Sequence, residues 1–540
     1  MQATDRRKLP QSDEVTLAEV NSELVIAKLN NPNDPNLQRI IQGSPILFPT
    51  IQCGNRETVP TIKGQKAWSD KDADNQALID IVWNQLSSRF ADLQQTGAFH
   101  AFDGAWQILA PVLKSIFRDE FAEMLGEKHN QNARNAYIKA VAWHPHREIL
   151  AVAHQDDVVF VYQLEGHRWV SRMLSHEFMV DVSSMEWKYR SAGTLAVGAR
   201  SGVCIWDLYS NIGKMPPHFS FDSGVPKKIP NVSSGSSSGS SSVSGTHSPT
   251  SGLAKGAWMS YLQYPKHTSI LSLSWDPTPG SHLLASTSAI DSTVVIWDTL
   301  TDTATPLRRP DNGLHIVRWS PNGVWIFVAS VKGHIRVWET RRWTDKLILN
   351  PSGRAVKSAC WTPDGANLFY SLRGEDELRM IYFNKASSGI DCKSISIKNF
   401  PVVEETLASG EKQKVNGAIR NICIDQVTGE RMVISFEDSN VLALFLVRKM
   451  TGLAVATDSV CLFSGYIRGA ALNVQPPSVT NISTLPIVNT ESLGDAQPLH
   501  ITFARKFEHG SLLSIAWSNG AVTFVPLYFL DSSKITAPKF

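Results

Sequence analysis

Residues 267–298, HTSILSLSWDPTPGSHLLASTSAIDSTVVIWD, decide the fold of this chain. Three short apolar runs, at 270–275, 283–288 and 293–297, are separated by turn-forming segments. This pattern predicts three antiparallel strands joined by tight turns. The third run has apolar residues on both faces, so we expect that strand to be covered on two sides. One small sheet cannot provide that cover, whereas neighbouring copies of the same sheet can.

The same unit recurs along the chain. Five copies of its first strand end in tryptophan, and two weaker copies lie at residues 422–423 and 501–503. The five tryptophans are Trp143, Trp187, Trp275, Trp319 and Trp361. Their spacings are 44 residues (143 to 187), twice 44 (187 to 275) and 42 (319 to 361). Such spacings are typical of WD-type propeller blades, which repeat about every 40–45 residues.

A second landmark lies 19 to 22 residues after the first, where the third strand of each copy ends. In three copies it is a tryptophan followed by an acidic residue, as in Trp206-Asp207, Trp297-Asp298 and Trp338-Glu339. The strong and weak copies together make seven units between residues 130 and 530. We therefore predict an all-β protein, a seven-bladed WD40-type β-propeller.

The last of these units is incomplete. It supplies strands at 501–503, 512–517 and 521–525, after which only a short tail remains, so its outer strand is missing. A strand-like segment at 15–27 has no blade of its own. Because an open sheet edge leaves backbone groups unpaired, we predict that this N-terminal strand pairs with the last blade and closes the ring.

The composition is that of a large globular protein, and its net charge gives no sign of a polyanionic partner held by overall charge. The 540 residues are 42% apolar and 19% charged, with a net charge of +2, so nothing supports direct binding of nucleic acid. The six cysteines form no Cys-x-x-Cys pair, which favours reduced thiols over a disulfide or zinc framework. The N-terminus has no apolar signal sequence, and the apolar run 441–447 is far shorter than the ~20 residues of a membrane span. We expect no membrane span in this chain.

The chain outside the blades divides into several segments. Residues 68–128 carry apolar stripes at helical spacing and predict two or three amphipathic helices ahead of the ring. Their role is either to pack on the propeller rim or to dock a partner. The predicted organisation is an N-terminal extension at 1–67 with the closing strand near 15–27, the helical segment 68–128, the propeller 130–530 and a short tail 531–540.

Two long insertions interrupt the blades. Residues 232–252 are serine-rich, with eleven serines between 233 and 252, and predict a disordered linker because they have almost nothing to bury. Ser248, which precedes a proline, is a possible phosphorylation site, and an unmodified spacer is the alternative. A second polar insertion, 473–498, enters the last blade. We expect both insertions to lie outside the ring.

The sequence shows no catalytic constellation, no cofactor-binding loop and no set of metal ligands. His144 and His146, in Trp-His-Pro-His, stand two residues apart without a third ligand nearby, so we interpret them as turn residues. We predict that the chain is not an enzyme and needs no cofactor.

The remaining polar candidates are structural. Asp156, Asp291 and Asp376 each stand six residues before the aromatic residue that closes a third strand. That place resembles the aspartate that fixes the turn between the second and third strands of WD-type blades, and His267 resembles its histidine partner. Arg200 and Lys332 hold the place in two other blades, which must fix their turns differently. The predicted structural positions are thus Trp143, Asp156, Trp187, Trp206, Asp207, His267, Trp275, Asp291, Trp297, Asp298, Trp319, Trp338, Trp361 and Asp376.

Several stretches carry a closer resemblance. The opening VTLAEVNSELV, the segment VAWHPHREILAVAHQDDVVFVY, the unit LLASTSAIDSTVVIWD and the ending AQPLHITFARKFEHGSLLSIAWSNGAVTFVPLYF occur in this order. Together they resemble the Aladin family of WD-repeat nucleoporins, from about residue 15 to residue 529. The serine-rich loop, the 473–498 insertion and the short tail depart from the family pattern.

The resemblance implies a non-catalytic scaffold or adaptor subunit of the nuclear pore complex. Such a subunit would be held at the nuclear envelope by a transmembrane nucleoporin, as a monomer within a larger complex, and would support nucleocytoplasmic transport. A role at the mitotic spindle poles is also implied. Two alternatives remain open at this point: an adaptor or substrate receptor of another complex, such as a ubiquitin ligase, and a propeller enzyme with acids, bases or a metal at the channel mouth.

Overall fold

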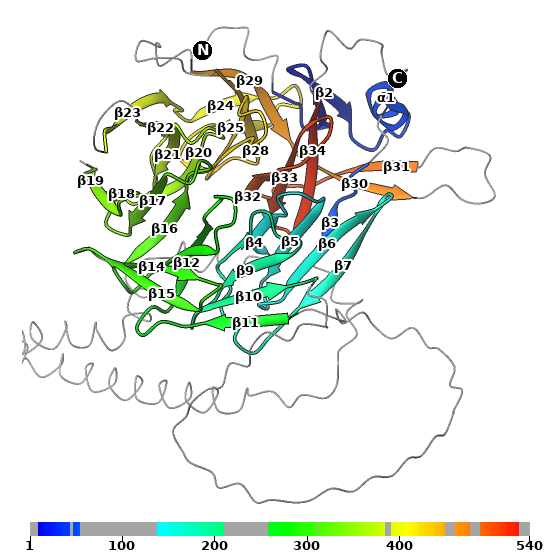
Figure 1. Cartoon of the computed structure of the whole chain (residues 1–540). Helices are drawn as coiled ribbons and strands as arrows, with labels where there is room; N and C mark the ends of the chain where they lie inside the picture. Colours follow the sequence, from blue (N-terminus) through cyan, green and yellow to red (C-terminus); the bar gives the residue numbers. More distant parts are fainter. Residues whose placement is uncertain are drawn as a thin grey trace, which may run out of the picture. The chain divides into compact units, whose positions relative to one another are not determined.

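The structure is a computed structural model that describes residues 9–43, 47–53, 138–209, 258–311, 313–350, 352–383, 390–448, 460–475 and 487–528. Figure 1 shows that these residues form a ring of β-sheets, the seven-bladed propeller that the repeats predict. The predicted helical segment 68–128, the serine-rich loop 232–252 with Ser248, and the tail 531–540 lie outside the described residues. The predictions for those segments therefore stay predictions.

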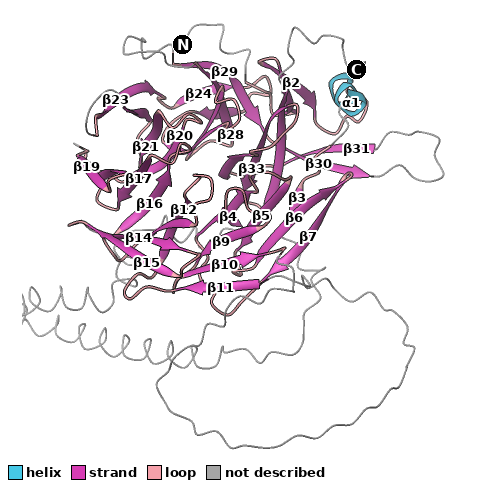
Figure 2. Cartoon of the chain, in the orientation of Figure 1, coloured by secondary structure: helices cyan, strands magenta, loops and turns pink. Residues whose placement is uncertain are grey.

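Six blades are four-stranded antiparallel sheets, each built from strands that follow one another in the chain (Figure 2). Blade 1 contains β4 (Ile138–Trp143), β5 (Ile149–His154), β6 (Val159–Glu165) and β7 (Arg168–Leu174); blade 2 contains β8 (Ser184–Trp187), β9 (Thr194–Gly198), β10 (Val203–Asp207) and β11 (Trp258–Leu262). Blade 3 contains β12 (Ile270–Trp275), β13 (Leu283–Ser288), β14 (Thr293–Asp298) and β15 (Thr303–Arg308); blade 4 contains β16 (Leu314–Trp319), β17 (Trp325–Ser330), β18 (Ile335–Glu339) and β19 (Thr344–Ile348). Blade 5 contains β20 (Val356–Trp361), β21 (Asn367–Leu372), β22 (Glu377–Phe383) and β23 (Cys392–Asn399); blade 6 contains β26 (Ile419–Ile424), β27 (Arg431–Phe436), β28 (Val441–Val447) and β29 (Cys461–Arg468).

The core lies between adjacent blades, as the two-sided apolar run of β14 predicts. On one face of β14, Val295 and Trp297 pack in a cluster with Ile205 of blade 2. On the other face, Val294 packs in a cluster with Val317 of blade 4. Because each fully buried side chain of this kind contributes about 1.5–3 kcal/mol, the blades stabilise one another.

The tryptophans that end the first strands also link neighbouring blades through hydrogen bonds. The indole N–H of Trp187 donates to the carbonyl oxygen of Ala142 at 3.0 Å. The indole of Trp275 donates to the carbonyl oxygen of Glu186 at 3.1 Å, and that of Trp361 to the carbonyl oxygen of Arg318 at 3.1 Å. In each case the acceptor is the residue before the aromatic that ends the first strand of the preceding blade. The most visible sequence landmark is thus a contact between repeats.

Blade 7 is completed by the N-terminus, as predicted. Its own strands are β32 (Pro498–Phe503), β33 (Gly510–Trp517) and β34 (Ala521–Tyr528). The outer edge of β34 pairs with β1 (Glu14–Val20) near its end and with β3 (Ile51–Gln52) near its start. In Figure 1 the N-terminal strands, in blue, lie beside β34, in red.

The closing segment differs from the predicted single strand in two ways. It is a hairpin of β1 and β2 (Glu23–Lys28), which turns at Asn21 and Ser22, both with positive φ. This is the backbone that two-residue hairpin turns require, but Asn-Ser signals it less strongly than Asn-Gly does. In addition, β1 runs parallel to β34, whereas the fourth strands of the other blades are antiparallel to their third strands.

Three elements stand outside the blades in the described part of the chain. Helix α1 (Pro35–Gly43) begins after Asp34, whose carboxylate accepts the backbone N–H of Asn36 at 2.9 Å as an N-cap. The hairpin of β24 (Val403–Thr406) and β25 (Lys412–Val415) precedes blade 6. The hairpin of β30 (Ala470–Gln475) and β31 (Ile487–Ser492) overlaps the 473–498 insertion.

Deleting residues 1–27 is expected to lower the thermal midpoint of the ring by more than about 5 °C. The deletion removes β1, uncovers the edge of β34 and takes away the buried side chains of Val15, Leu17 and Ala27. Differential scanning calorimetry at a fixed scan rate measures the midpoint. Deletion of residues 1–8 alone is the control, because it leaves the closing hairpin in place. An unchanged midpoint after the longer deletion would show that the ring does not need the N-terminal strand.

Candidate functional site

Blade 3 contains a chain of polar contacts that joins its strands. His267, which is fully buried ahead of β12, makes a hydrogen bond from Nε2 to Ser286 Oγ at 2.8 Å. The indole N–H of Trp297 donates to the same Ser286 oxygen at 2.8 Å. His267 Nδ1 lies 3.7 Å from a carboxylate oxygen of Asp291. The structure thus brings together His267, Asp291 and Trp297, three of the structural positions predicted from the sequence. Ser286, which contacts two of them, was not predicted.

Blades 2 and 4 lack this serine. Val197 and Val328 take the position of Ser286, and the indole nitrogens of Trp206 and Trp338 are buried with no hydrogen-bond partner among the described residues. The turns of these blades carry other side-chain contacts, as expected from Arg200 and Lys332 at the aspartate position. In blade 2, Arg200 lies 3.6 Å from Asp181. In blade 4, His334 Nδ1 lies 3.1 Å from Asp311.

In blade 1 the turn contacts fall on Asp157 rather than on the predicted Asp156. The Asp157 carboxylate accepts the backbone N–H groups of Asp181 and Val182, each at 2.8 Å, and lies 2.7 Å from Lys139 Nζ. Asp157 has a φ of 62°, a left-handed conformation that an aspartate tolerates and that turns its carboxylate toward the next blade. A one-residue offset of this kind depends on the backbone, so spacing could not identify it.

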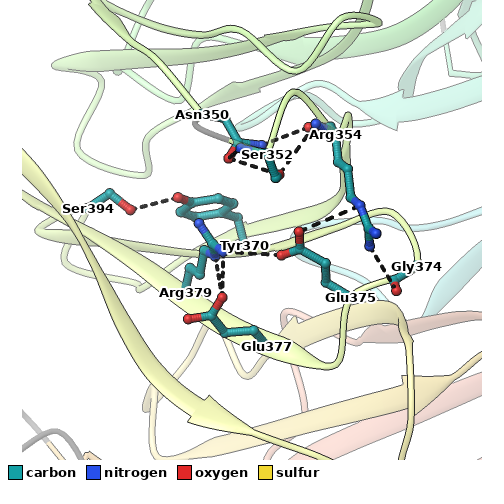
Figure 3. Close-up of polar contacts among 9 residues, drawn as sticks. All are labelled: Asn350, Ser352, Arg354, Tyr370, Gly374, Glu375, Glu377, Arg379 and Ser394. Atoms are coloured by element: carbon teal, nitrogen blue, oxygen red, sulfur yellow. Dashed lines mark hydrogen bonds and ion pairs between the residues drawn. The ribbon is translucent and has the colours of Figure 1, made fainter.

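In blade 5 the side-chain contacts at the turn likewise fall on neighbours of the predicted Asp376 rather than on Asp376 itself (Figure 3). The Arg379 guanidinium donates to Glu377 at 2.8 Å and to Glu375 at 3.2 Å. Arg354, from the segment before β20, lies 3.9 Å from the same Glu375. Asp376 contributes its backbone, since its carbonyl oxygen accepts the N–H of Phe400 at 2.8 Å. An arginine held between two glutamates therefore fixes this turn.

The other residues predicted as structural positions lie at the ends of strands. The side chains of Trp143, Trp187, Trp275, Trp319 and Trp361 are all buried at the ends of their first strands. Asp207 and Asp298 cap short turns: Asp207 accepts the N–H of Tyr209 at 3.2 Å, and Asp298 accepts the N–H of Leu300 at 2.9 Å. His144 is buried and uses both ring nitrogens, with His146 N at 3.1 Å and the Ala192 carbonyl oxygen at 3.2 Å. The structure places these residues at turns and blade junctions.

The stability of the ring is expected to fall as the pH drops from about 6.5 to about 4. Burial lowers the pKa of His267 from 6.5 to about 4, although Asp291 opposes the shift, and burial likewise lowers the pKa of His144 to about 4. In this window the unfolded chain binds protons at these histidines and the folded chain does not. Each histidine therefore lowers the free energy of unfolding by up to about 1.4 kcal/mol for every pH unit that the pH falls. Urea unfolding at several pH values measures the slope. His267→Gln should reduce the slope, and a slope unaffected by His267→Gln would contradict the assignment.

The surface that distinguishes this ring from a plain propeller lies at blades 6 and 7. We call it the N-terminal platform: the described residues of 9–53 together with the β24–β25 and β30–β31 hairpins. It has a small core of its own, which joins the β1–β2 hairpin, α1 and the β30–β31 hairpin. The buried members of this core are Val15, Leu17, Ala27, Leu37, Ile41, Leu47, Ala470 and Val488.

Polar bonds join the parts of the platform to one another. Leu472 and Thr50 exchange two hydrogen bonds, with the Leu472 N–H donating to the Thr50 hydroxyl at 2.7 Å and the Thr50 N–H donating to the Leu472 carbonyl at 2.9 Å. The Gln11 side chain accepts the backbone N–H of Ala408, beside β25, at 2.7 Å. The platform is therefore an ordered surface, built from segments that are hundreds of residues apart in sequence.

A buried ion pair ties the platform to blade 6. Arg431, on β27, lies 2.8 Å from Glu19, on β1, and its Nε donates to the same carboxylate at 2.9 Å. The two side chains are 7% and 0% exposed, so removing either one leaves the other buried without its charged partner. Because β1 pairs with β34 of blade 7, this contact makes the closing segment span two blades.

In the part of the chain that the structure describes, no helix is long and apolar enough to cross a membrane. Within the same residues, no group of three or more His, Cys, Asp or Glu side chains is arranged to hold a metal ion.

Comparison with known proteins agrees with the fold and extends the resemblance to the whole chain. The sequence pattern described as "WD domain, G-beta repeat" matches residues 259–298, which run from β11 of blade 2 through β14 of blade 3, and residues 307–339, which run from the end of β15 of blade 3 through β18 of blade 4. The chain is 24% identical over 530 residues to Aladin of Arabidopsis thaliana, an alignment that covers 96% of this chain and 98% of that protein. The similarity thus includes the N-terminal platform as well as the blades.

Proposed function

We propose that this chain, an Aladin-like WD-repeat protein, is a scaffold or adaptor subunit of the nuclear pore complex, held at the nuclear envelope by a transmembrane nucleoporin. The WD-repeat propeller and the similarity to Aladin support a nucleoporin-like, non-enzymatic scaffold. Support of nucleocytoplasmic transport is part of the same proposal. A role at the mitotic spindle poles is proposed from the resemblance alone.

The observation that carries the proposal is the platform. A plain propeller offers only turns and strand edges for contacts with a partner. The platform adds a packed surface in which the apolar side of α1 faces inward, with Leu37 and Ile41 buried, while Arg39 and Gln42 are exposed. We propose that this exposed side is the docking surface for the transmembrane partner.

The test combines localisation with recovery of partners. The variant Arg39→Glu with Gln42→Glu changes the charge of the platform without touching its core, so we expect normal abundance with loss of the nuclear-rim signal. The matched control, Arg341→Glu with Thr344→Glu, makes the same charge change at exposed positions of blade 4 and should keep the signal. Fluorescence imaging and quantitative immunoblotting measure position and abundance.

Affinity purification of the tagged protein separates this proposal from the alternative adaptor. Recovery of pore subunits, lost in the Arg39/Gln42 variant, supports the docking role of the platform. Recovery of ubiquitin-ligase subunits without pore subunits, together with no enrichment at the nuclear rim, would favour a substrate receptor of a ligase instead. Imaging of the same cells in mitosis tests the spindle proposal.

A further inference from the structure

A tyrosine at the junction of blades 1 and 2 is surrounded by arginines. The guanidinium carbon of Arg147 lies 5.0 Å from the centroid of the Tyr209 ring, and that of Arg172 lies 6.0 Å from it. Arg147 is in the turn between β4 and β5, and Arg172 is on β7 of the same blade. The backbone N–H of Arg190, in blade 2, donates to His146 Nε2 at 3.2 Å, so a third arginine stands beside the first two. We call Arg147, Arg172, Arg190 and Tyr209 the arginine cluster.

Carboxylates do not balance the charges of the arginine cluster. Its three arginines are exposed, and within the described residues none of them forms an ion pair. Glu148 and Asp207, which are close to the cluster in sequence, are partly buried, and the Asp207 carboxylate accepts the backbone N–H of Tyr209 at 3.2 Å. A planar guanidinium donates two parallel N–H bonds to a phosphate, which makes arginine well suited to bind this group. The cluster therefore has the chemistry of a phosphate-binding surface.

The chain leaves the described structure at this cluster. Residues 210–257 follow Tyr209, and the chain returns at Trp258, which pairs with Asp207 in the sheet of blade 2. Ser248 stands ten residues before Trp258 in the sequence. Because an extended chain spans about 3.3 Å per residue, Ser248 can lie up to about 33 Å from Trp258. The arginine cluster is within that reach, since Tyr209 is two residues from Asp207.

The charge of this segment depends on whether its serines are modified. Residues 210–257 contain four lysines and one aspartate, a net charge of +3, so the unmodified segment is repelled by the arginine cluster. The stretch 233–252, with its eleven serines, contains no Lys, Arg, Asp or Glu. A phosphate on Ser248, which precedes Pro249, would add about −1.5 to −2 charges and three acceptor oxygens. Phosphorylation would thus turn the local repulsion into attraction.

We propose that the arginine cluster binds phosphorylated Ser248 of the same chain. A proline-directed protein kinase supplies the phosphate: the Ser248 oxygen bonds to the γ-phosphorus of ATP, the bond from that phosphorus to ADP breaks, and the hydroxyl proton is released. Arg147 and Arg172 pair with the phosphate oxygens.

Two features favour this occupant. Because the segment is attached beside the cluster, it acts at an effective concentration of about millimolar. Three arginines are too few for a nucleic acid, whose binding needs many cations. The site goes beyond the proposed function, because its residues belong to blades 1 and 2 and none belongs to the N-terminal platform.

Fluorescence anisotropy with the purified, unphosphorylated full chain tests the arginine cluster. The probe is a labelled synthetic peptide of residues 241–257 with a phosphate on Ser248, and the matched probe lacks the phosphate. We expect only the phosphorylated probe to bind, and more weakly as NaCl is raised. The variant Arg147→Gln with Arg172→Gln should weaken binding by at least about tenfold. The control variant Lys332→Gln with Arg341→Gln removes the same charge from exposed positions of blade 4 and should bind as the wild type does.

The same probe tests whether the chain's own segment is the occupant. The full chain is phosphorylated by a proline-directed kinase, and mass spectrometry verifies the phosphate on Ser248. This protein should bind the free probe at least about tenfold more weakly, because its attached phosphoserine occupies the cluster. Ser248→Ala treated with the kinase in the same way should bind the probe as the untreated wild type does. Thermal melts check that every variant is folded.

The proposal is overturned if the phosphorylated probe does not bind, or if the Arg147/Arg172 variant binds it as tightly as the wild type. It is also overturned if phosphorylation of Ser248 leaves the affinity for the free probe unchanged, a result that would assign the cluster to a phosphopeptide of another protein. Binding of phosphatidylserine vesicles or of a single-stranded oligonucleotide through the cluster, without binding of the probe, would overturn it as well.

Discussion

Replacing Arg431 with alanine is expected to lower the free energy of unfolding by about 3–5 kcal/mol. Arg431 and Glu19 are 7% and 0% exposed and lie 2.8 Å apart, so the substitution leaves the Glu19 carboxylate buried without its partner. It also removes the donor that reaches the Ser22 hydroxyl at 3.3 Å, in the turn of the closing hairpin. Chemical denaturation followed by tryptophan fluorescence measures the change.

A double-mutant cycle separates the ion pair from other effects of the substitution. Glu19→Ala should cost about as much as Arg431→Ala, and the double variant should cost clearly less than the sum, because no unpaired charge is left buried. Glu430, which is 55% exposed and 3.9 Å from Arg431, provides the control: Glu430→Ala should change stability by less than about 0.5 kcal/mol. A cost below about 1 kcal/mol for Arg431→Ala would mean that the pair does not hold the closing segment on blade 6.

The pair also explains how a parallel closing strand is held. The pairing between β1 and β34 joins Glu19 with Leu527 and Val20 with Tyr528, which is a short ladder. The Glu19 side chain reaches blade 6 from the same place where its backbone pairs with blade 7. Loss of the pair should therefore loosen ring closure, and hydrogen exchange of β1 and β34 amides should rise in Arg431→Ala more than exchange of blade 3.

Replacing Trp297 with alanine is expected to destabilise the ring by about 3–5 kcal/mol and to lower the abundance of the protein in cells. The Trp297 side chain is 3% exposed and packs between blades 2 and 3 with Ile205 and Leu284. The cavity would open at the junction where β14 depends on its neighbours. Denaturation measures the stability, and immunoblotting alongside imaging measures abundance and position. If Trp297→Ala lost the nuclear-rim signal while its abundance stayed normal, this mechanism would be contradicted. That result is expected only of the platform variant.

Conversion to phenylalanine isolates the hydrogen bond of the same residue. Trp297→Phe removes the indole N–H that donates to Ser286 at 2.8 Å, whereas Trp206→Phe removes an indole N–H that has no partner among the described residues. Both changes delete a similar buried volume, so Trp297→Phe should cost about 1 kcal/mol more than Trp206→Phe. Equal costs would show that the Ser286 contact contributes nothing to the stability of blade 3.

The architecture of the ring could be predicted from local signals. A strand-ending tryptophan every 42 to 44 residues and an apolar run covered on both faces, as at 294–297, are properties of a few neighbouring residues. The number of strands also gave a local signal. The last blade lacked its fourth strand, and one predicted strand near 15–27 belonged to no blade. Every blade has the same strands and turns, so a sequence pattern that is weak evidence in one copy becomes strong evidence when it recurs in seven.

The polar contacts were predicted less well, because they depend on backbone geometry. Spacing located the turns of blades 1 and 5, but the contacts fall on Asp157 and Glu375 rather than on Asp156 and Asp376. Ser286 was missed because a serine in a strand has no distinctive signal until the tryptophan and histidine that share its oxygen are in place. A shift of one residue turns a side chain to the other face, and no count of residues can resolve it.

The sequence alone determined the fold class, the number of blades and the partner strand that closes the ring, because these follow from short-range periodicity and from one unpaired edge. The tertiary structure alone decided the parallel direction of β1, the pairing of Glu19 with Arg431 across 412 residues of chain, and the platform core shared by α1 and the β30–β31 hairpin. Each of these joins groups that are far apart in sequence, and only the closed ring brings them within bonding distance.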